Sequence, residues 1–401
     1  MAATSQLLIV RWSTFNRSID IFKFDPVKPP SFDTGVKYGD PVRVNTDTWD
    51  NFDNQNFLIS YPDVIFDYEN NEMAFACGMG LGGGLFLKYG RIAEYGISLS
   101  TQDWMIMQMP GFLPRTIIYE NATMAICQKA LNIAFPHVSN NSESVWLKRR
   151  TTDMTNPWKD IQIKTTEREL NGGGIVFARL VCPSPANANF STVYCLSSRG
   201  DSKFINIDSI DYKYFGELSK NPDIQWQRLY YSYGALADDP PDLSRRPGPM
   251  SVAFTFDKVE NKWRMYFFFL TQFVNDHNIY YHHITVRSDG SVPPPSAAEQ
   301  DSKAADSSVP KREKVYSAKP SAIGSAIHPV NADLSSAIHV KEYQNRLWVF
   351  WSEHGTGSFC SASIENDGGL GEWKHYPGFP IPGHQPDCQF IPVIATPGFI
   401  D

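Results

Sequence analysis

Leu347-Trp348-Val349-Phe350-Trp351 is the stretch of sequence that decides the fold. It is apolar throughout and rich in aromatic and β-branched residues, which is typical of a strand buried on both faces. A turn with two glycines follows at 352–357, a further strand is expected over 359–364, and an Asn-Asp-Gly-Gly turn leads to another strand from 372. With residues 337–340 as the first partner, these four short antiparallel strands have the size of one β-propeller blade.

Similar apolar runs recur along the chain, and each is expected to be the second strand of its own blade. They lie at 7–12, 73–77, 124–128 and 265–269. Their first strands are expected over 64–68, 117–119 and 252–256, joined to the runs by turns that carry Glu and Asn. Another unit is expected in the middle of the chain, from strands over 175–181, 193–196, 204–212 and 225–230.

The last apolar segment, 389–395, has no following partner and is expected to pair with residues 7–12. Both termini then share one blade, which removes the open edges. The predicted fold is all-β: a six-bladed β-propeller of four-stranded antiparallel blades, forming a single domain over 1–401. The expected blades are 1–48 with 388–401, 60–110, 113–165, 172–232, 248–292 and 335–378, and the irregular repeats also leave five or seven blades open. The segment 288–325, rich in Ser, Ala, Pro and Lys, is predicted to be an unstructured insertion between blades.

Composition restricts the partners. The 401 residues carry a net charge of −7, and no long run of basic residues is present to bind nucleic acid or an anionic membrane. No apolar stretch reaches the ~18 residues of a transmembrane helix. We therefore expect hydrophobic small molecules as partners, with no nucleic acid and no transmembrane segment, and a homodimer is left open.

The compartment is also left open. The first residues contain no basic segment followed by an apolar one, so no signal peptide is expected here. Four glycosylation sequons, at Asn16, Asn121, Asn140 and Asn189, favour the secretory pathway or an extracellular location. The six cysteines contain no CxxC pair; a bridge between Cys182 and Cys195 is one option, and buried thiols are the favoured one.

Two motifs suggest cofactors at first sight. Residues 78–84 contain a GxGxxG pattern, but a strand is expected after it, and a dinucleotide site needs a helix there. His282 and His283 are adjacent in an expected strand, so they point to opposite faces and do not bind one ion. We expect no metal and no organic cofactor.

The candidate site follows from the loops that converge at one end of a propeller. The residues expected there are aromatic and apolar with a few cations, which suits a hydrophobic molecule carrying an acidic or oxygenated ring. The alternative for each aromatic residue is packing of blade against blade. The predicted catalytic residues are Arg11, Glu353, His354 and His384, and the predicted substrate-binding residues are Trp12, Trp49, Met79, Phe112, Arg115, Lys129, Gln272 and Trp351.

Two carbohydrate-related functions, a glycoside hydrolase and a lectin, are compatible with the sequence. Residues 98–104 and 363–373 resemble the Asp-box turns of sialidase-like propellers, which implies a glycoside hydrolase with three arginines gripping a carboxylate; Arg11, Arg115 and Arg179 are the candidates. A fucose-type fungal propeller lectin is the other alternative. Lectins of that family reuse one set of residues in every blade, whereas the residues after the apolar runs of this chain do not repeat. This favours a single asymmetric site.

Over its full length the sequence resembles the fungal hetero-Diels–Alderases of tropolonic sesquiterpenoid biosynthesis. The resemblance lies in size, in the degenerate six-blade pattern, in aromatic richness and in the sequons. It implies a cofactor-free pericyclase that joins a tropolone ortho-quinone methide to a humulene-type terpene by an inverse-electron-demand hetero-Diels–Alder reaction. In such a reaction a cation such as Arg11 would donate to the heterodiene oxygens, and Glu353 with His354 would assist the loss of water that forms the quinone methide.

Overall fold

The fold is taken from a computed structural model of the chain. It describes residues 5–13, 18–28, 42–44, 63–78, 84–90, 105–108, 123–127, 129–138, 142–150, 158–167, 175–182, 192–199, 204–211, 227–233, 247–257, 261–271, 279–287, 290, 315–318, 321–322, 330–332, 337–344, 346–354, 358–365, 373–380 and 388–397. The regular structure of these residues consists of 25 strands. The chain divides into two compact units, residues 1–120 with 325–401 and residues 121–324.

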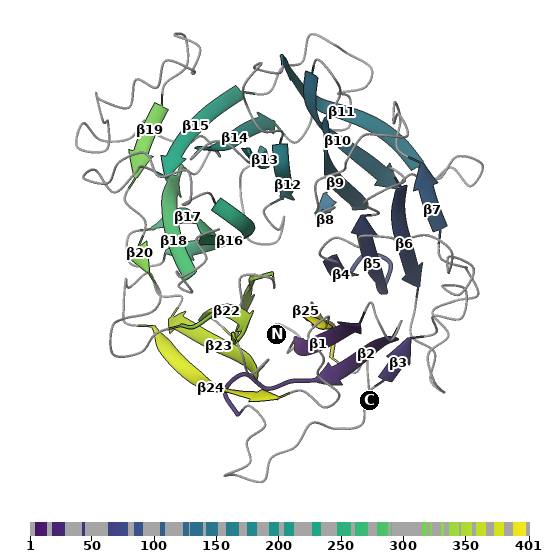
Figure 1. Ribbon diagram of the computed structural model, residues 1–401, viewed down its shortest axis with the longest axis vertical. Coiled ribbons are helices and arrows are strands. Elements are labelled where there is room, and N and C mark those ends of the chain that lie inside the picture. The colour runs from purple at the N-terminus through teal and green to yellow at the C-terminus, as the bar shows by residue number, and fades with distance from the viewer. Residues whose placement is uncertain are drawn as a thin grey trace. The chain divides into compact units, whose positions relative to one another are not determined.

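The first unit contains three four-stranded antiparallel sheets (Figure 1). The terminal sheet has the order β25 (Cys388–Ala395), β1 (Gln6–Ser13), β2 (Ser18–Lys23), β3 (Val42–Val44). The next is formed by β4 (Asp63–Asp67), β5 (Glu72–Gly78), β6 (Gly84–Gly90) and β7 (Met105–Gln108). The third is formed by β21 (His339–Tyr343), β22 (Arg346–Ser352), β23 (Ser358–Glu365) and β24 (Lys374–Pro380).

The second unit also contains three sheets. The first is formed by β8 (Thr123–Cys127), β9 (Ala130–Val138), β10 (Ser142–Arg150) and β11 (Trp158–Glu167). The second is formed by β12 (Ile175–Val181), β13 (Thr192–Arg199), β14 (Phe204–Asp211) and β15 (Gln227–Tyr233), with β19 (Val315–Ala318) as a fifth, parallel strand. The third is formed by β16 (Pro247–Asp257), β17 (Lys262–Thr271) and β18 (Ile279–Val286), with β20 (Ser321–Ala322) at its edge.

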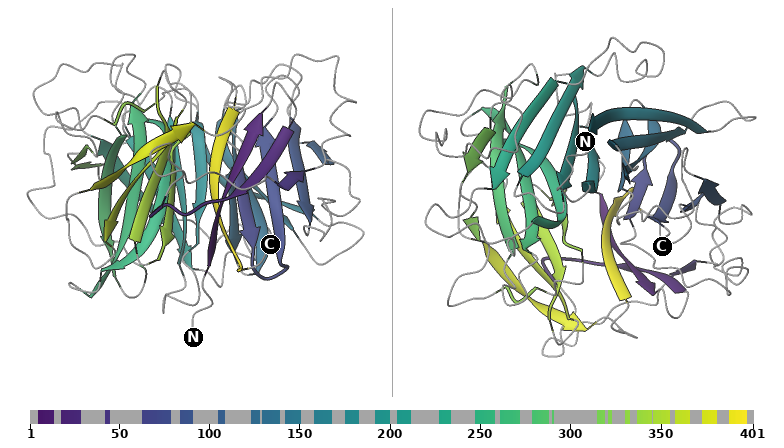
Figure 2. Two further views of the ribbon diagram at one scale, coloured as in Figure 1. Left: turned by 90° about the horizontal axis from the view of Figure 1, so that it is seen from below. Right: turned by 45° about the horizontal axis from the view of Figure 1, so that its top comes forward.

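Apart from the added edge strands β19 and β20, the sheets are antiparallel series of strands that follow one another in the chain, which is the topology of β-propeller blades. The terminal sheet departs from this order because its first strand comes from the C-terminus. β25 pairs with β1 along its whole length, from Gln6 opposite Ala395 to Ser13 opposite Cys388. Figure 2 shows the yellow β25 beside the purple β1. The prediction of an all-β propeller fold whose two termini share one blade is confirmed; a closed ring of six blades stays a prediction.

The apolar run of β22 is buried on both faces, as its sequence indicates. Leu347 to Ser352 are all buried, and only Arg346 at the start of the strand is partly exposed. The turn before this strand has Gln344 at a positive φ of 50°. The expected strand pairs of the β4–β7 sheet, the β12–β15 sheet and the β16–β18 sheet are likewise present.

The terminal sheet is packed on both faces by the other two sheets of the first unit. Leu7 and Ile9 of β1 belong to one core cluster with Trp348 and Phe350 of β22. On the opposite face, Trp12 is fully buried and its ring lies 6.3 Å from that of Phe75 on β5. The period of two along β1 therefore decides which neighbouring sheet each side chain contacts.

Two predicted segments differ from the structure. Residues 124–127 form β8, the first strand of its sheet, and not a second strand; the expected partner 117–119 lies outside the described residues. Lys129 has a positive φ of 57°, which makes a tight turn into β9 and so pairs β8 with the strand that follows it. The segment predicted to be unstructured, 288–325, contains the short strands β19 and β20.

Deleting residues 388–401 should abolish cooperative folding. The deletion removes β25, leaves β1 with an open edge, and strips Phe390, Ile391 and Val393 from the buried core. Deleting only residues 398–401 leaves β25 intact and is the matched control. We expect insoluble protein, or a broad thermal transition, for the long deletion alone. A soluble long deletion with a sharp unfolding transition would contradict the pairing.

Tyr68 joins the β4–β7 sheet to the terminal sheet. Its hydroxyl donates to the carbonyl oxygen of Ile394 over 2.9 Å, and nearby the Thr396 hydroxyl lies 3.3 Å from Asn71 Oδ1. Loss of hydration on folding raises the pKa of Tyr68 to about 12, although the residue is 54% exposed. The folded chain thus favours the neutral phenol, which is the form that donates the hydrogen bond.

The effect of Tyr68→Phe on stability should therefore depend on pH. In the unfolded chain tyrosine ionises near pH ~10, so the stabilisation is complete below that pH and is lost as the pH rises toward about 12. At neutral pH we expect the variant to be less stable by about 0.5–1.5 kcal/mol, the value of one hydrogen bond. Urea unfolding at neutral pH and near pH ~11 measures the difference. If the stability difference between wild type and Tyr68→Phe stays constant or grows as the pH rises, folding does not raise the pKa of Tyr68.

Candidate functional site

The end of β22 carries an acid and an imidazole next to each other. Glu353 and His354 follow directly after Ser352, the last residue of the strand. Glu353 is half-buried and His354 is exposed, whereas Trp351 and Ser352 before them are buried. The polypeptide thus passes from a buried strand to an accessible pair of groups that can donate and accept protons.

This end of β22 is held in place by a second segment of the first unit, residues 330–332. Ala332 pairs with Glu353 in an isolated antiparallel β-bridge. The backbone N–H of His354 donates to the carbonyl oxygen of Asn331 over 2.8 Å, and Asn331 Nδ2 donates to the carbonyl oxygen of His354 over 3.3 Å. The indole N–H of Trp351 donates to the carbonyl oxygen of Val330 over 3.1 Å.

Asn331 is suited to this role by its backbone conformation. Its φ is 48°, in the left-handed region that Asn adopts more readily than most residues other than Gly. This conformation accompanies a two-way exchange of hydrogen bonds with His354 across the gap between the two segments. We define the braced segment as residues 330–332 together with 351–354. It fixes the backbone of Glu353 and His354, the two predicted catalytic residues that follow β22.

Arg11, predicted to be catalytic, lies in a different environment. It is directly opposite Asp20 in the register of β1 and β2, and its Nη2 forms an ion pair with Asp20 Oδ2. The Asp20 side chain is fully buried and that of Arg11 is 12% exposed. The guanidinium also lies 5.7 Å from the centre of the Phe22 ring. Arg11 is therefore a buried cation that is neutralised within its own sheet.

The two predicted substrate-binding indoles are not brought together. Trp12 lies on the face of the terminal sheet that packs on β5. Trp351 alternates with Phe350, so it lies on the face of β22 turned away from the terminal sheet. Both rings are buried by protein, at 0% and 3% exposure. The two rings therefore lie on faces of β1 and β22 that are turned away from each other.

In the second unit, Lys129 is exposed at the turn between β8 and β9. Hydrogen bonds from two polar side chains of neighbouring strands stabilise this turn. Asn132 Nδ2 donates to the carbonyl oxygen of Ala130 over 2.7 Å, and Arg149 Nη1 donates to Asn132 Oδ1 over 3.2 Å and to the Cys127 carbonyl oxygen over 3.3 Å. Lys129 is thus a cation on a well-supported turn.

The same turn is cross-linked to the neighbouring sheet. Cys127, at the end of β8, forms a disulfide with Cys182, next to the end of β12, with a Cα–Cα distance of 5.7 Å. The suggested bridge between Cys182 and Cys195 is therefore wrong, and so is the expectation that Cys182 is a thiol. Cys195 lies on β13 as a buried thiol outside this disulfide. The pairing joins residues 55 positions apart, a relation that local spacing does not reveal.

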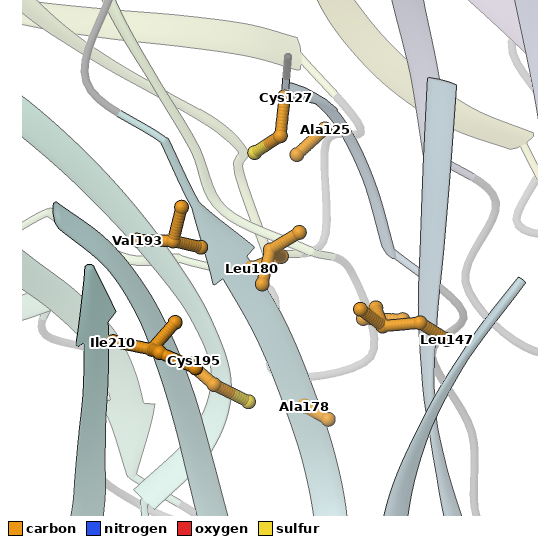
Figure 3. Packing of buried hydrophobic residues seen from close by; sticks show 9 residues of the cluster. Ala125, Cys127, Leu147, Ala178, Leu180, Val193, Cys195 and Ile210 are labelled. Carbon is orange, nitrogen blue, oxygen red and sulfur yellow. The ribbon is translucent and has the colours of Figure 1, made fainter. Parts of the chain in front are cut away.

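The disulfide lies at one end of a small apolar core between these two sheets. Figure 3 shows Cys127 and Ala125 on β8 near Leu180 and Val193, with Leu147 and Ala178 farther along the same core. The hydroxyl of Thr123 donates to the carbonyl oxygen of Ala178 over 2.8 Å, which ties β8 to β12 at its other end. Many of the contact residues are small, so the sheets approach closely enough for the disulfide to form.

The structure also contains a cation–imidazole pair that the sequence did not single out. Arg264 on β17 is buried, and its Nη1 lies 3.1 Å from Nε2 of His283 on β18. The ring of His283 lies 5.2 Å from that of Tyr266, and His282 occupies the opposite face because it pairs with Phe267. Among the described residues, no group of three His, Cys, Asp or Glu side chains is arranged to hold a metal ion.

The remaining predicted site residues lie outside the described residues, so their positions stay predictions. They are Trp49, Met79, Phe112, Arg115, Gln272 and His384. The strand predicted after the GxGxxG pattern is present as β6.

Within the described part of the chain, no helix is long and apolar enough to cross a membrane.

Comparison with known proteins gives a likeness in architecture. No family model matches the sequence, and no curated protein matches it. The chain is similar to a GH93 α-L-arabinofuranosidase of Fusarium graminearum, with 7% identity over 81% of this chain and 82% of that one and a TM-score of 0.46. It is also similar to a putative exo-β-1,3-galactanase from Bifidobacterium bifidum, with 10% identity over 80% and 92% of the two chains and a TM-score of 0.40. Likenesses of this size carry no argument about the activity of this chain.

Breaking the Arg11–Asp20 pair should cost more stability than replacing both of its members. Asp20→Asn leaves a buried guanidinium without its counter-charge, and we expect it to lower the free energy of unfolding by about 3–5 kcal/mol. The double variant Arg11→Met with Asp20→Leu removes both charges, and it should recover most of this loss. Urea unfolding of the two single variants and the double variant measures the coupling. Additive losses in the double variant would contradict a buried, mutually dependent pair.

Proposed function

We propose that this chain is a cofactor-free enzyme that forms an ortho-quinone methide from a hydroxymethyl-substituted tropolone and directs its hetero-Diels–Alder reaction with a humulene-type alkene. The observation that carries the proposal is the braced segment. It holds the backbone of two consecutive residues, the half-buried Glu353 and the exposed His354, at the end of a buried aromatic strand.

The first step assigns opposite roles to the two groups. The Glu353 carboxylate accepts the proton of the ring hydroxyl, and the imidazolium of His354 gives a proton to the departing hydroxyl of the side chain. The carbon–oxygen bond of the hydroxymethyl group breaks and water leaves. The electron pair from the ring O–H bond becomes part of the new carbonyl, and the exocyclic carbon becomes a methylene. Proton return from Glu353 to His354 through solvent restores the starting state.

In the second step, the cycloaddition, the enzyme has to orient the two reactants and does not have to transfer a proton. The heterodiene of the quinone methide and the alkene form one carbon–carbon and one carbon–oxygen bond, with no atom lost. Holding the two molecules together in the reactive orientation contributes several kcal/mol. Arg115 remains a candidate donor to a substrate oxygen. Arg11 is assigned a structural role, because Asp20 already neutralises it.

A glycoside hydrolase is the second candidate, favoured by one observation: Glu353 is half-buried and its backbone is held by a β-bridge. Such an enzyme needs a second carboxyl group about 5–9.5 Å away. In a sialidase-type enzyme, Arg115 and Arg179 remain candidates for gripping a carboxylate, because Arg11 is paired with Asp20.

The Cys127–Cys182 disulfide adds to the proposal of a secretory location. Disulfides form and persist in oxidising compartments, and the four sequons point the same way. We propose that the protein passes through the secretory pathway.

Glu353→Gln and His354→Gln should each slow product formation from the hydroxymethyl substrate by about 10²-fold or more, the usual contribution of one acid or base. Glu69→Gln, at an exposed acid in the β4–β5 turn, is the matched control and should leave the rate unchanged. Product is measured by chromatography with folding checked by thermal melting. Wild-type rates for both variants would move the site elsewhere.

A substrate with a better leaving group tests the individual role of His354. Acetate leaves without prior protonation, so the acetylated substrate should restore the rate of His354→Gln while Glu353→Gln stays slow. A hydrolase is identified by release of nitrophenol from nitrophenyl glycosides, with loss in Glu353→Gln. Hydrolysis without cycloaddition would replace the proposed function by the second candidate.

A further inference from the structure

The short strands β19 and β20 lie along the outer edges of two different sheets. β19 pairs in parallel with β15, from Tyr230 opposite Val315 to Tyr233 opposite Ala318. Two residues later, β20 pairs antiparallel with β18, with Tyr281 opposite Ser321 and Tyr280 opposite Ala322. We call β19 and β20 together the strap. They come from the C-terminal part of the segment 288–325 and pair with strands that would otherwise end the sheets.

Without the strap, β15 would be an outer strand with a row of unpaired N–H and C=O groups. Such an edge is a template for pairing with another strand. The sequence of β15, Gln227 to Tyr233, has three tyrosines, one leucine and a single charge, with no Gly or Pro. This composition favours extended pairing with a like segment.

The cover is held by few contacts. The strap pairs through four residues on β15 and two on β18, and the lone pairing of so short a strand is marginal in water. It is also connected by long segments, since 28 residues separate Val286 at the end of β18 from Val315. The strap can therefore open at a low free-energy cost while the sheets beneath it stay folded.

We propose that the outer edge of β15 is a self-association surface whose partner is β15 of a second copy of this chain, and that the strap covers it in the monomer. Two β15 strands related by a two-fold axis pair antiparallel, which closes the interaction at a dimer. The strap competes for the same edge from within the chain. Because it is tethered, its pairing is intramolecular and does not depend on protein concentration, so the monomer dominates when the protein is dilute.

The test is to replace residues 315–322 by Gly/Ser of equal length in the full chain. We expect the apparent mass in light scattering to double as the protein concentration is raised through the micromolar range, while wild type stays monomeric. An equal-length Gly/Ser replacement of residues 301–308, in the same insertion, is the matched control and should also stay monomeric.

Two additions connect association with the edge itself. A synthetic peptide of residues 312–324 should bind the strap-replaced chain in fluorescence anisotropy and return it to a monomer, whereas the same peptide with Tyr316→Pro should do neither. Adding Tyr231→Lys to the strap-replaced chain places a charge on the edge strand and should suppress the dimer. The point variant Tyr316→Pro in the full chain should reproduce part of the association if the larger replacement misfolds.

A strap-replaced chain that stays monomeric at all concentrations and fails to bind the peptide would overturn the proposal. Association that persists unchanged with Tyr231→Lys would also overturn it, because the contact would then lie elsewhere.

Discussion

The pairing of β25 with β1 is the constraint on which the first unit depends. It places the last strand of the chain beside the first, with eight residues opposite eight. Each backbone hydrogen bond contributes only about 0.5–1.5 kcal/mol net, but an unmade ladder would leave a whole row of polar groups exposed at a sheet edge. The terminal sheet is also the one on which both other sheets of this unit pack, through Trp12 on one face and Leu7 and Ile9 on the other. The unit is therefore completed only when the end of the chain is in place, and contacts this distant in sequence form slowly.

In the first unit, the buried aromatic residues and the accessible proton-transferring residues occupy different positions along the strands. The large rings of β1 and β22 are directed between sheets, where they fill the core, and the accessible polar groups appear where a strand ends. Glu353 and His354 illustrate this, because they follow immediately after buried residues and are held by the bridge to Ala332 and the hydrogen bonds with Asn331. A site built on a braced strand end is more precisely positioned than one on a free loop.

The second unit uses connections of a different kind. The Cys127–Cys182 disulfide closes a loop of 55 residues, for which the loop-entropy relation gives a stabilisation of about 4 kcal/mol. The strap joins two sheets by backbone pairing alone and is the weaker link. The disulfide therefore fixes β8 to the end of β12, whereas the strap can separate from β15 and β18 without breaking a covalent bond. That division is the physical basis for proposing self-association at β15 and not at β8.

The sequence by itself determined the class of fold and most of the strands. Period-two alternation, apolar runs and Gly/Asn/Asp turns are local signals, and they predicted the hairpins of β4–β5, β16–β17 and β21–β22 together with the pairing of the two termini. It also indicated Glu353 and His354 as a pair, because they are adjacent in the chain. What only the tertiary structure decided is strand register and the contacts between distant segments. Arg11 is neutralised because Asp20 lies opposite it across a hairpin, and Trp12 and Trp351 diverge because neighbouring sheets cover opposite faces. Cys127 meets Cys182 and Asn331 meets His354 for the same reason: partners 55 and 23 positions apart are chosen by sheet packing, which local composition does not encode.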